Sequence, residues 1–380
     1  MTDFGDQATL TIDLDALVAN WRRLGALAPA AECAAVVKAD AYGLGAARVG
    51  PALFAAGCRR FFVAHSGEAL ALRAALPAST GAIIHVLHGP GPGGEDDLAA
   101  AGIVPVLSTP GQIAAWQAAA RRAGRALPAA LHIDTGMNRL GLTAAEADQV
   151  TADASRLDGI ALEFVMTHLA CADEPEHPLN TQQRDRFAAW RQRFPGLKGS
   201  LANSAGIFLG PDFHHDLLRP GIALYGSNPL GPAAGPRGDA AKMAQVVHLQ
   251  GKILQVRSVD SGMTVGYGAG YIVEKPSRIA TIAIGYADGF TRSLSSRGFA
   301  VIRGRQGHMR VPIAGRVSMD LITLDVSAVP DGDCRPGDAV DLIGGGVDID
   351  AQAATAGTIA YELLTQLGRR YRRIYTGAAA

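Results

Sequence analysis

The sequence predicts an α/β fold in which an N-terminal (βα)8 barrel is followed by a mostly β domain. Three observations support this prediction. Short β-rich runs alternate with alanine-rich helical stretches up to about residue 225, residues 228–239 (NPLGPAAGPRGD) have the Gly/Pro content of a linker, and β-rich runs with little helix follow. The 380 residues suffice for two domains with separate cores. We expect the barrel to cover residues 1–235 and the β domain residues 236–380.

The expected elements follow in chain order. A strand at residues 9–12, within about residues 8–13, precedes a helix from Leu14 through Trp21, and this strand is a candidate for packing with the C-terminal domain. Eight β-rich runs follow, at residues 34–37, 60–64, 82–87, 103–107, 130–133, 161–167, 200–203 and 222–225. Helical spacing lies between most of them, as at residues 111–123 and 182–194. Eight such repeats fit a closed parallel barrel, although a doubly wound open sheet would show the same periodicity.

The second domain is expected to be built from strands. The β-rich runs lie at residues 244–256, 278–284, 300–302, 310–313 and 322–326, and a single helix is expected at residues 354–367. The barrel repeat does not continue into this part of the chain.

The composition points to a small-molecule site. Hydrophobic residues make up 48% of the chain and charged residues 18%, and 35 basic residues balance 35 acidic ones. This balance provides no electrostatic footprint for nucleic acid or for an anionic membrane. Gly, Pro or charged residues interrupt every apolar stretch before the roughly 18 residues that a membrane span requires.

The cysteines and the N-terminus indicate a cytoplasmic protein. Cys33, Cys58, Cys171 and Cys334 are scattered and lack the spacing of a metal site, so we expect free thiols and no metal. The first residues lack a basic segment followed by an apolar core and a cleavage site, which a secretory signal would show.

Lys38 is the most informative candidate residue. It ends an apolar run in AVVKADAYGLGA, where a buried strand gives way to a glycine-containing loop. A desolvated lysine at a strand end can lose its proton and form a Schiff base with an aldehyde. His65, Arg139, His168 and Ser204 also follow predicted strands, at the barrel end where active sites occur.

Two segments are candidates for binding a phosphate group. Ser204 begins the turn SAG, and Gly221 and Ile222 follow Arg219 in RPGI. Glycine loops and helix N-termini offer backbone N–H donors, and barrel enzymes often bind phosphate in the loops after the last two strands.

Nine ordered motifs resemble the alanine racemase family. They are AVVKADAYGLGA, HIDTGMNRLG, THLACADE, NSAG, RPGIALYG, VGYGAGY, IGYADG, GRVSMD and AYE, and the similarity extends from Thr11 to about Tyr375. The resemblance implies a fold-type III isomerase dependent on pyridoxal 5'-phosphate that interconverts L- and D-alanine, for peptidoglycan or for catabolism. It also implies a homodimer with active sites shared between the chains.

The resemblance assigns roles residue by residue. Lys38 would hold the cofactor as an aldimine and act on one face of the substrate Cα, and Tyr267 of the partner chain would act on the other. The implied cofactor-binding residues are Lys38, Tyr42, His168, Ser204, Arg219, Gly221, Ile222 and Tyr361. Arg139 and Met319 would bind the substrate carboxylate, and the entry corridor or surrounding shell would include Asp173, Tyr286, Arg316, Asp320 and His132. Arg219 would face the pyridine nitrogen, where a guanidinium that retains its proton limits side reactions.

The chain departs from the family pattern at two positions. Many alanine racemases have a carbamylated lysine seven residues before the arginine of the TGM-R motif, where this chain has His132. A histidine cannot form that carbamate, so Arg139 must be oriented by other means, such as a neutral imidazole, a water or an anion. Ser318 replaces a cysteine found in some relatives.

Three competing functions remain open at this point. A broader racemase would act on serine, lysine or arginine. A fold-type III decarboxylase would share the barrel and its lysine, but its second-domain motif is not found around Cys334. A non-enzymatic pyridoxal-phosphate-binding protein would lack the second domain.

Overall fold

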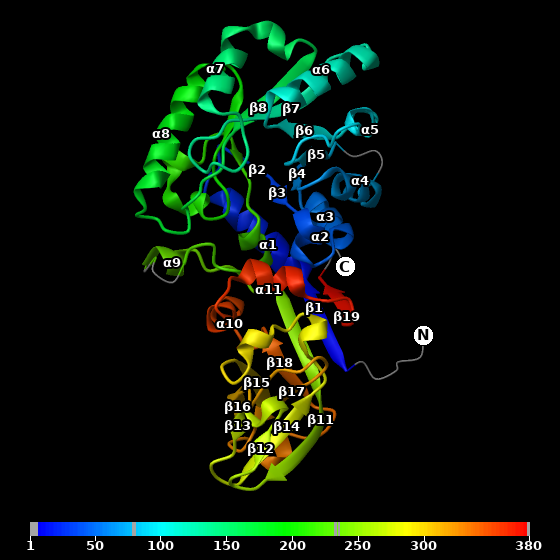
Figure 1. Cartoon of the computed structure of the whole chain (residues 1–380), viewed down its shortest axis with the longest axis vertical. Coiled ribbons are helices and arrows are strands. Elements are labelled where there is room, and N and C mark those ends of the chain that lie inside the picture. The colour runs from blue at the N-terminus through cyan, green and yellow to red at the C-terminus, as the bar shows by residue number, and fades with distance from the viewer. Residues whose placement is uncertain (1–6, 78–80, 232–233, 235, 378–380) are drawn as a thin grey trace. The chain divides into compact units, whose positions relative to one another are not determined.

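The computed structural model describes residues 7–77, 81–231, 234 and 236–377. Backbone contacts divide the chain into two compact units, with divisions between residues 15 and 16 and between residues 244 and 245. Figure 1 shows both units, one with helices around a parallel sheet and one rich in β-strands. Among the described residues, no helix is long and apolar enough to cross a membrane.

The first unit contains the predicted parallel barrel. Its strands are β2 (Glu32–Cys33), β3 (Ala35–Val36), β4 (Arg60–Val63), β5 (Ile83–Val86), β6 (Val104–Leu107), β7 (Leu127–His132), β8 (Ile160–Met166), β9 (Lys198–Ser200) and β10 (Leu217–Leu218). Strands β3 to β9 form one parallel sheet in chain order.

Backbone hydrogen bonds close this sheet into a ring. Strand β10 pairs in parallel with β2, and Ala34 N–H donates to Leu218 O at 3.0 Å. On the other side of β10, Arg219 N–H donates to Ala202 O at 3.0 Å. These bonds complete the (βα)8 barrel and confirm the predicted fold class over the open doubly wound sheet.

The barrel unit also contains helices α1 to α9. Their bounds are α1 (Leu14–Ala26), the short turn α2 (Lys38–Tyr42), α3 (Ala46–Ala55), α4 (Ser66–Ala75), α5 (Glu95–Ala100), α6 (Pro110–Ala123), α7 (Ala144–Ala152), α8 (Pro178–Gln192) and α9 (Pro236–Ala240). Local sequence explains where several of them begin. Thr109 caps α6 by accepting the Gln112 N–H, and Thr143 forms a reciprocal capping box with Glu146 at the start of α7.

Two predicted elements are wrong, and a third lies partly outside the described residues. Residues 222–225 form a buried 3-10 turn and not the eighth strand, which is β10. A short apolar run bounded by glycines does not distinguish a buried strand from a buried turn. The helix expected at residues 354–367 is two helices, because Gly357 ends the first in a left-handed conformation with φ of 75°. The expected linker at residues 228–239 includes the start of α9, and its residues 232, 233 and 235 lie outside the described residues.

The second unit contains one eight-stranded sheet and one separate two-stranded sheet. Its strands are β1 (Ala8–Asp13), β11 (Val247–Val259), β12 (Thr264–Val265), β13 (Tyr271–Ile272), β14 (Ser277–Ile282), β15 (Phe299–Gly304), β16 (Gly307–Pro312), β17 (Ile322–Asp325), β18 (Ala339–Ile343) and β19 (Arg372–Thr376). Helices α10 (Ile349–Ala356) and α11 (Ala360–Gln366) belong to the same unit. The long strand β11 pairs with β1, β18 and β14, and β1 also pairs in parallel with β19.

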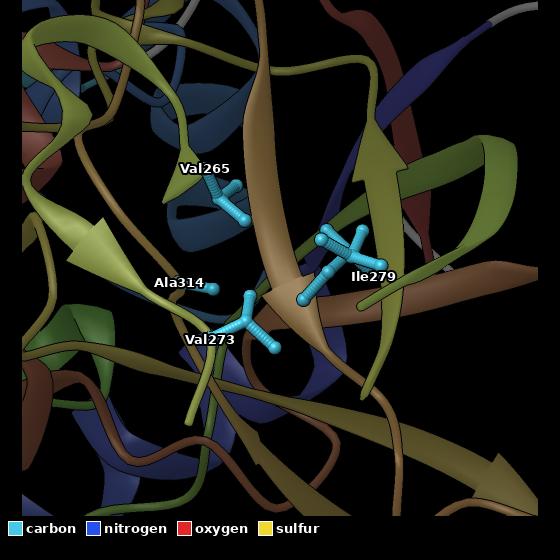
Figure 2. Packing of buried hydrophobic residues seen from close by; sticks show 5 residues of the cluster. Val265, Val273, Ile279 and Ala314 are labelled. Carbon is cyan, nitrogen blue, oxygen red and sulfur yellow. The ribbon is translucent and has the colours of Figure 1, made fainter. Parts of the chain in front are cut away.

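A small apolar cluster supports the β12–β13 hairpin. Figure 2 shows Val265, Val273, Ile279 and Ala314 directed toward one another. Tyr271 packs against this cluster. Because β12 and β13 flank residues 266–270, the cluster anchors the loop that carries Tyr267.

Candidate active site

Lys38 lies at the carboxyl end of β3, as predicted. Its side chain is half-buried. Burial lowers the pKa of the ammonium below its usual value, nearby Arg139 lowers it further, and the Glu68 carboxylate opposes both effects. A lowered pKa increases the fraction of neutral amine, which is the form that attacks an aldehyde.

The backbone after Lys38 forms a left-handed turn. Ala39, Asp40, Ala41 and Tyr42 have φ angles of 51° to 55°. This conformation costs an L-residue roughly 1–2 kcal/mol, so four in succession are a substantial local strain. Such strain persists only where surrounding contacts maintain it, and it concentrates at functional sites.

The turn directs Tyr42 toward the predicted phosphate-binding segment. Its ring contacts Tyr225 at a centroid distance of 4.6 Å, and a Cβ on Gly221 would collide with Tyr42 Oη. Ser204 Oγ accepts the Gly221 N–H at 2.8 Å and the Ala223 N–H at 3.3 Å. The hydroxyls of Tyr42 and Ser204 therefore lie close to the backbone N–H groups of this segment, and position 221 has room only for glycine.

Arg219 is a buried cation held by neutral acceptors. Its guanidinium donates to Ser200 Oγ, to Thr167 O at 2.7 Å and to Leu201 O at 3.4 Å. No carboxylate in the described part of the chain pairs with it, and burial lowers its pKa to about 9. Because no carboxylate of the described residues neutralises its charge, the Arg219 guanidinium can donate a hydrogen bond to an electron-rich acceptor such as a ring nitrogen.

His168 is held in a network that sequence reasoning missed. Fully buried Gln183 donates to His168 O at 2.9 Å and to Thr135 Oγ1 at 3.2 Å, and it accepts the Ala170 N–H at 2.8 Å. The amide thereby joins the loops after β7 and β8. Asn180, Gln183 and Phe187 are all buried on α8, so polar residues on its buried helical face were the available signal.

The loop that carries Arg139 is shaped by its backbone and by Asp134. Leu142 N–H donates to His132 O at 2.8 Å, and Asp134 N–H donates to Leu142 O at 2.9 Å. The Asp134 carboxylate accepts N–H groups from residues 136, 137 and 138. The Arg139 side chain is exposed and has no hydrogen bond or ion pair within the described ranges.

The buried imidazole of His132 is neutral and packs against the loop that carries Arg139. A Cβ built on Gly141 would lie 3.1 Å from His132 Cδ2, and Ser108 Oγ lies 3.5 Å from His132 Nδ1. Burial lowers the pKa of the imidazole to about 4, and Arg219 and Arg139 contribute to this decrease. His132 therefore supports the loop sterically and adds no charge near neutral pH.

Tyr267 lies in the second unit on an exposed loop. Its side chain is 72% exposed, and it stands between Gly266 and Gly268, which have positive φ angles. The guanidinium of Arg316 packs against Gly268, where a Cβ would lie 2.8 Å from Nη1. The structure thus brings the loop of Tyr267 next to Arg316.

Met319 and Tyr286 are also exposed on this unit, on adjoining segments. Tyr286 N–H donates to Ser318 O, and Ala287 N–H donates to Met319 O, both at 3.0 Å. No acceptor in the described parts of the chain binds the Met319 N–H. The neighbouring residue Asp320 forms an ion pair with Arg370, in which Oδ1 lies 2.8 Å from Nη1.

The remaining predicted residues are divided between the two units. Ile222 is buried in the barrel, where its 3-10 turn begins, and Asp173 is exposed in the same unit. Tyr361 is 40% exposed in the first turn of α11 in the second unit. No metal-ligating cluster occurs in the part of the chain that the structure describes.

Comparison with known proteins decides the family. The sequence profile of the alanine racemase N-terminal domain matches residues 12–229, and that of the C-terminal domain matches residues 246–375. The chain belongs to the alanine racemase family. This result confirms the family predicted from the nine motifs.

Individual relatives match over almost their entire length. Alanine racemase of Rhodospirillum rubrum is 54% identical over 375 residues, covering 98% of this chain and 97% of the relative. A catabolic alanine racemase of Mesorhizobium japonicum is 50% identical over 370 residues, covering 97% and 93%. The crystal structure of Bartonella henselae alanine racemase, which has covalently bound pyridoxal phosphate, shows a TM-score of 0.90 at 40% identity, covering 97% and 99%. The predicted enzyme class and cofactor agree with these relatives.

Proposed function

We propose that this protein is a pyridoxal-phosphate-dependent racemase that interconverts L- and D-alanine. The observation that carries the proposal is Lys38, a half-buried lysine with a lowered pKa at the carboxyl end of a barrel strand. Membership of the alanine racemase family over both domains supports it, and it disfavours the decarboxylase and the single-barrel binding protein.

The barrel residues fit this cofactor. The hydroxyls of Tyr42 and Ser204 lie beside Gly221, and together with the N–H of Ile222 they would bind a phosphate. Arg219 is buried and pairs with no carboxylate among the described residues, so it is suited to hydrogen-bond the ring nitrogen. When bound, pyridoxal phosphate supplies an electron-withdrawing ring that acidifies the Cα–H of an attached amino acid.

The protein's own groups then hold the substrate and move the proton. Lys38 binds the cofactor covalently and serves as acid and base on one face of the substrate Cα. Exposed Arg139 binds the substrate carboxylate, and the Met319 N–H assists from the second unit of a partner chain. Tyr267 serves the opposite face, since racemisation removes a proton from one face and returns one to the other.

A homodimer with shared active sites is part of the proposal. The second unit exposes large apolar side chains on its Tyr267 and Met319 segments, including Ile272 at 63% and Leu321 at 37% exposure. Exposed apolar residues of this kind are typical of protein interfaces. A second copy of the chain is the partner that would cover them while Tyr267 reaches its active site.

Mixing two inactive variants tests the shared site. Lys38→Ala and Tyr267→Phe should each abolish racemisation as homodimers. Random reassociation of a 1:1 mixture gives half heterodimers with one intact site each, so about one quarter of wild-type activity should return. A mixture that stays inactive while forming dimers in analytical ultracentrifugation would exclude sites shared in this way.

An absorption spectrum tests the cofactor and its lysine. The purified protein should be yellow, and borohydride should fix the cofactor onto Lys38, as shown by peptide mass. Colourless protein that pyridoxal phosphate cannot reconstitute would contradict the proposal. Full activity in Lys38→Ala would contradict the role of the lysine.

Substrate range and physiological role need separate measurements. Comparing rates for alanine, serine, lysine and arginine separates an alanine racemase from a broader one, and a faster rate for a larger amino acid would overturn the choice of alanine. Cytoplasmic location is part of the proposal, and the four free cysteines are consistent with a reducing compartment. A D-alanine requirement after gene deletion would indicate a role in peptidoglycan synthesis, and growth on D-alanine that needs the gene would indicate catabolism.

A further inference from the structure

Glu68 makes contacts that none of the roles assigned so far explains. It is the third residue of α4, a position from which glutamate commonly accepts the N–H of the capping residue. Here its two carboxylate oxygens accept different backbone amides, Oε1 from Ala39 and Oε2 from Ala64, both at 2.8 Å. The side chain therefore ties the residue after Lys38 to the residue after β4.

The left-handed turn needs such external support. Within the segment, Gly43 N–H donates to Ala39 O at 2.7 Å, and Gly45 N–H donates to Asp40 O at 2.8 Å. Asp40 Oδ1 accepts the Ala46 N–H at 2.7 Å, which fixes the end of the segment to α3. Glu68 binds the first residue of the turn, so the strained backbone is held at both ends.

Glu68 is also the acidic neighbour that acts on the Lys38 ammonium. The other titratable groups that interact electrostatically with Lys38 are Arg139, His88 and His168. Arg139 disfavours the protonated lysine, and both histidines have lowered pKa values because burial and nearby cations disfavour their charged forms. The Glu68 carboxylate, whose Oε1 also lies 3.9 Å from His65 Nε2, favours the protonated lysine.

We propose that Glu68 is a positioning residue of this active site, which holds residues 39–42 in the left-handed conformation and so places Lys38 and Tyr42 for the cofactor. The inference rests on the proposed function only in that Lys38 carries pyridoxal phosphate. Glu68 acts through the backbone at Ala39 and through its charge, without touching the cofactor or the substrate.

Cofactor capture by the full-length apoenzyme tests both effects. Pyridoxal phosphate is titrated into apoenzyme, and the absorbance of the lysine-bound cofactor gives its affinity and its capture rate across pH. Glu68→Gln should weaken the affinity on the order of 10-fold, because one amide donor then faces the NH2 group of glutamine. The pH midpoint of the capture rate should move to lower pH, because the charge that favours protonated Lys38 is lost.

Glu68→Asp separates geometry from charge. It keeps the carboxylate but is one methylene shorter, so it cannot reach both amides. Affinity should fall while the pH midpoint stays near that of wild type.

Glu146→Gln is the matched control. Glu146 occupies the same third position in α7 and accepts the Thr143 N–H at 2.8 Å, but among the described residues it makes no hydrogen bond or ion pair with residues 38–42. This variant should retain wild-type cofactor affinity and pH midpoint.

The outcomes separate this inference from the proposed function. Wild-type affinity and pH midpoint in Glu68→Gln would overturn the role of Glu68. If that variant does not fold by tryptophan fluorescence, Glu68→Asp decides, since weakened affinity supports the role and wild-type affinity overturns it. Covalent capture by Lys38→Ala would contradict the proposed function whatever the Glu68 variants do.

Discussion

Replacing Gln183 by methionine tests whether one buried amide holds the active-site loops together. The substitution keeps the length of the side chain and removes its hydrogen bonds. The His168 carbonyl and the Ala170 N–H lose a partner, whereas Thr135 Oγ1 keeps its contact with Thr167 Oγ1 at 2.8 Å. A buried backbone group left unpaired costs about 1–3 kcal/mol, and both groups are only partly buried, so we expect a loss of about 2–3 kcal/mol.

Urea unfolding followed by tryptophan fluorescence measures this loss in the barrel alone. Trp21, Trp116 and Trp190 are the three tryptophans of the chain, and all belong to the barrel unit. The midpoint should fall on the order of 1 M for a unit of this size. Gln182→Met is the control, because Gln182 is the neighbouring exposed residue of α8. Equal midpoints for the two variants would refute the role assigned to Gln183.

Three further variants test local features of the barrel. Gly221→Ala should weaken binding of pyridoxal phosphate, since its Cβ would collide with Tyr42 Oη, whereas Gly67→Ala, which has open space around it, should bind normally. Wild-type affinity in Gly221→Ala would contradict the crowded phosphate site. Stability should fall as pH decreases from about 6.5 to 4, because unfolded His132 takes up a proton near 6.5 and folded His132 only near a pKa of about 4. His132→Gln should make this fall shallower, and an unchanged slope in acid titration would contradict the buried neutral imidazole. Thr143→Ala removes the cap of α7 and should cost about 1 kcal/mol in urea unfolding, and no loss would contradict the capping box seen in the structure.

Local sequence patterns were sufficient for most elements of the barrel. The runs predicted around β4 to β8 match the observed strands to within a few residues, because buried parallel strands are short, apolar and bounded by turn residues. The eighth strand could not be predicted this way. Strand β10 has only two residues, and its place in the ring depends on hydrogen bonds to residues 32–34, almost 200 positions earlier.

The sequence also identified the candidate residues of the site but not how they are held. Lys38 followed from an apolar run that ends in a lysine beside glycines, and the family motifs added Arg219 and Tyr267. The absence of a carboxylate partner for Arg219 among the described residues, and the exposure of Tyr267, are visible only in three dimensions.

By itself, the sequence determined the family, the barrel and β-domain architecture and the identity of the chemical groups, because motif order and short-range periodicity are local properties. Only the tertiary structure showed the left-handed turn after Lys38, the Glu68 carboxylate that supports it and the Gln183 amide that joins two loops. None of these follows from local propensity. A run of four residues in the left-handed region is disfavoured by its own sequence, and hydrogen bonds within residues 39–46 and to the distant Glu68 carboxylate stabilise it.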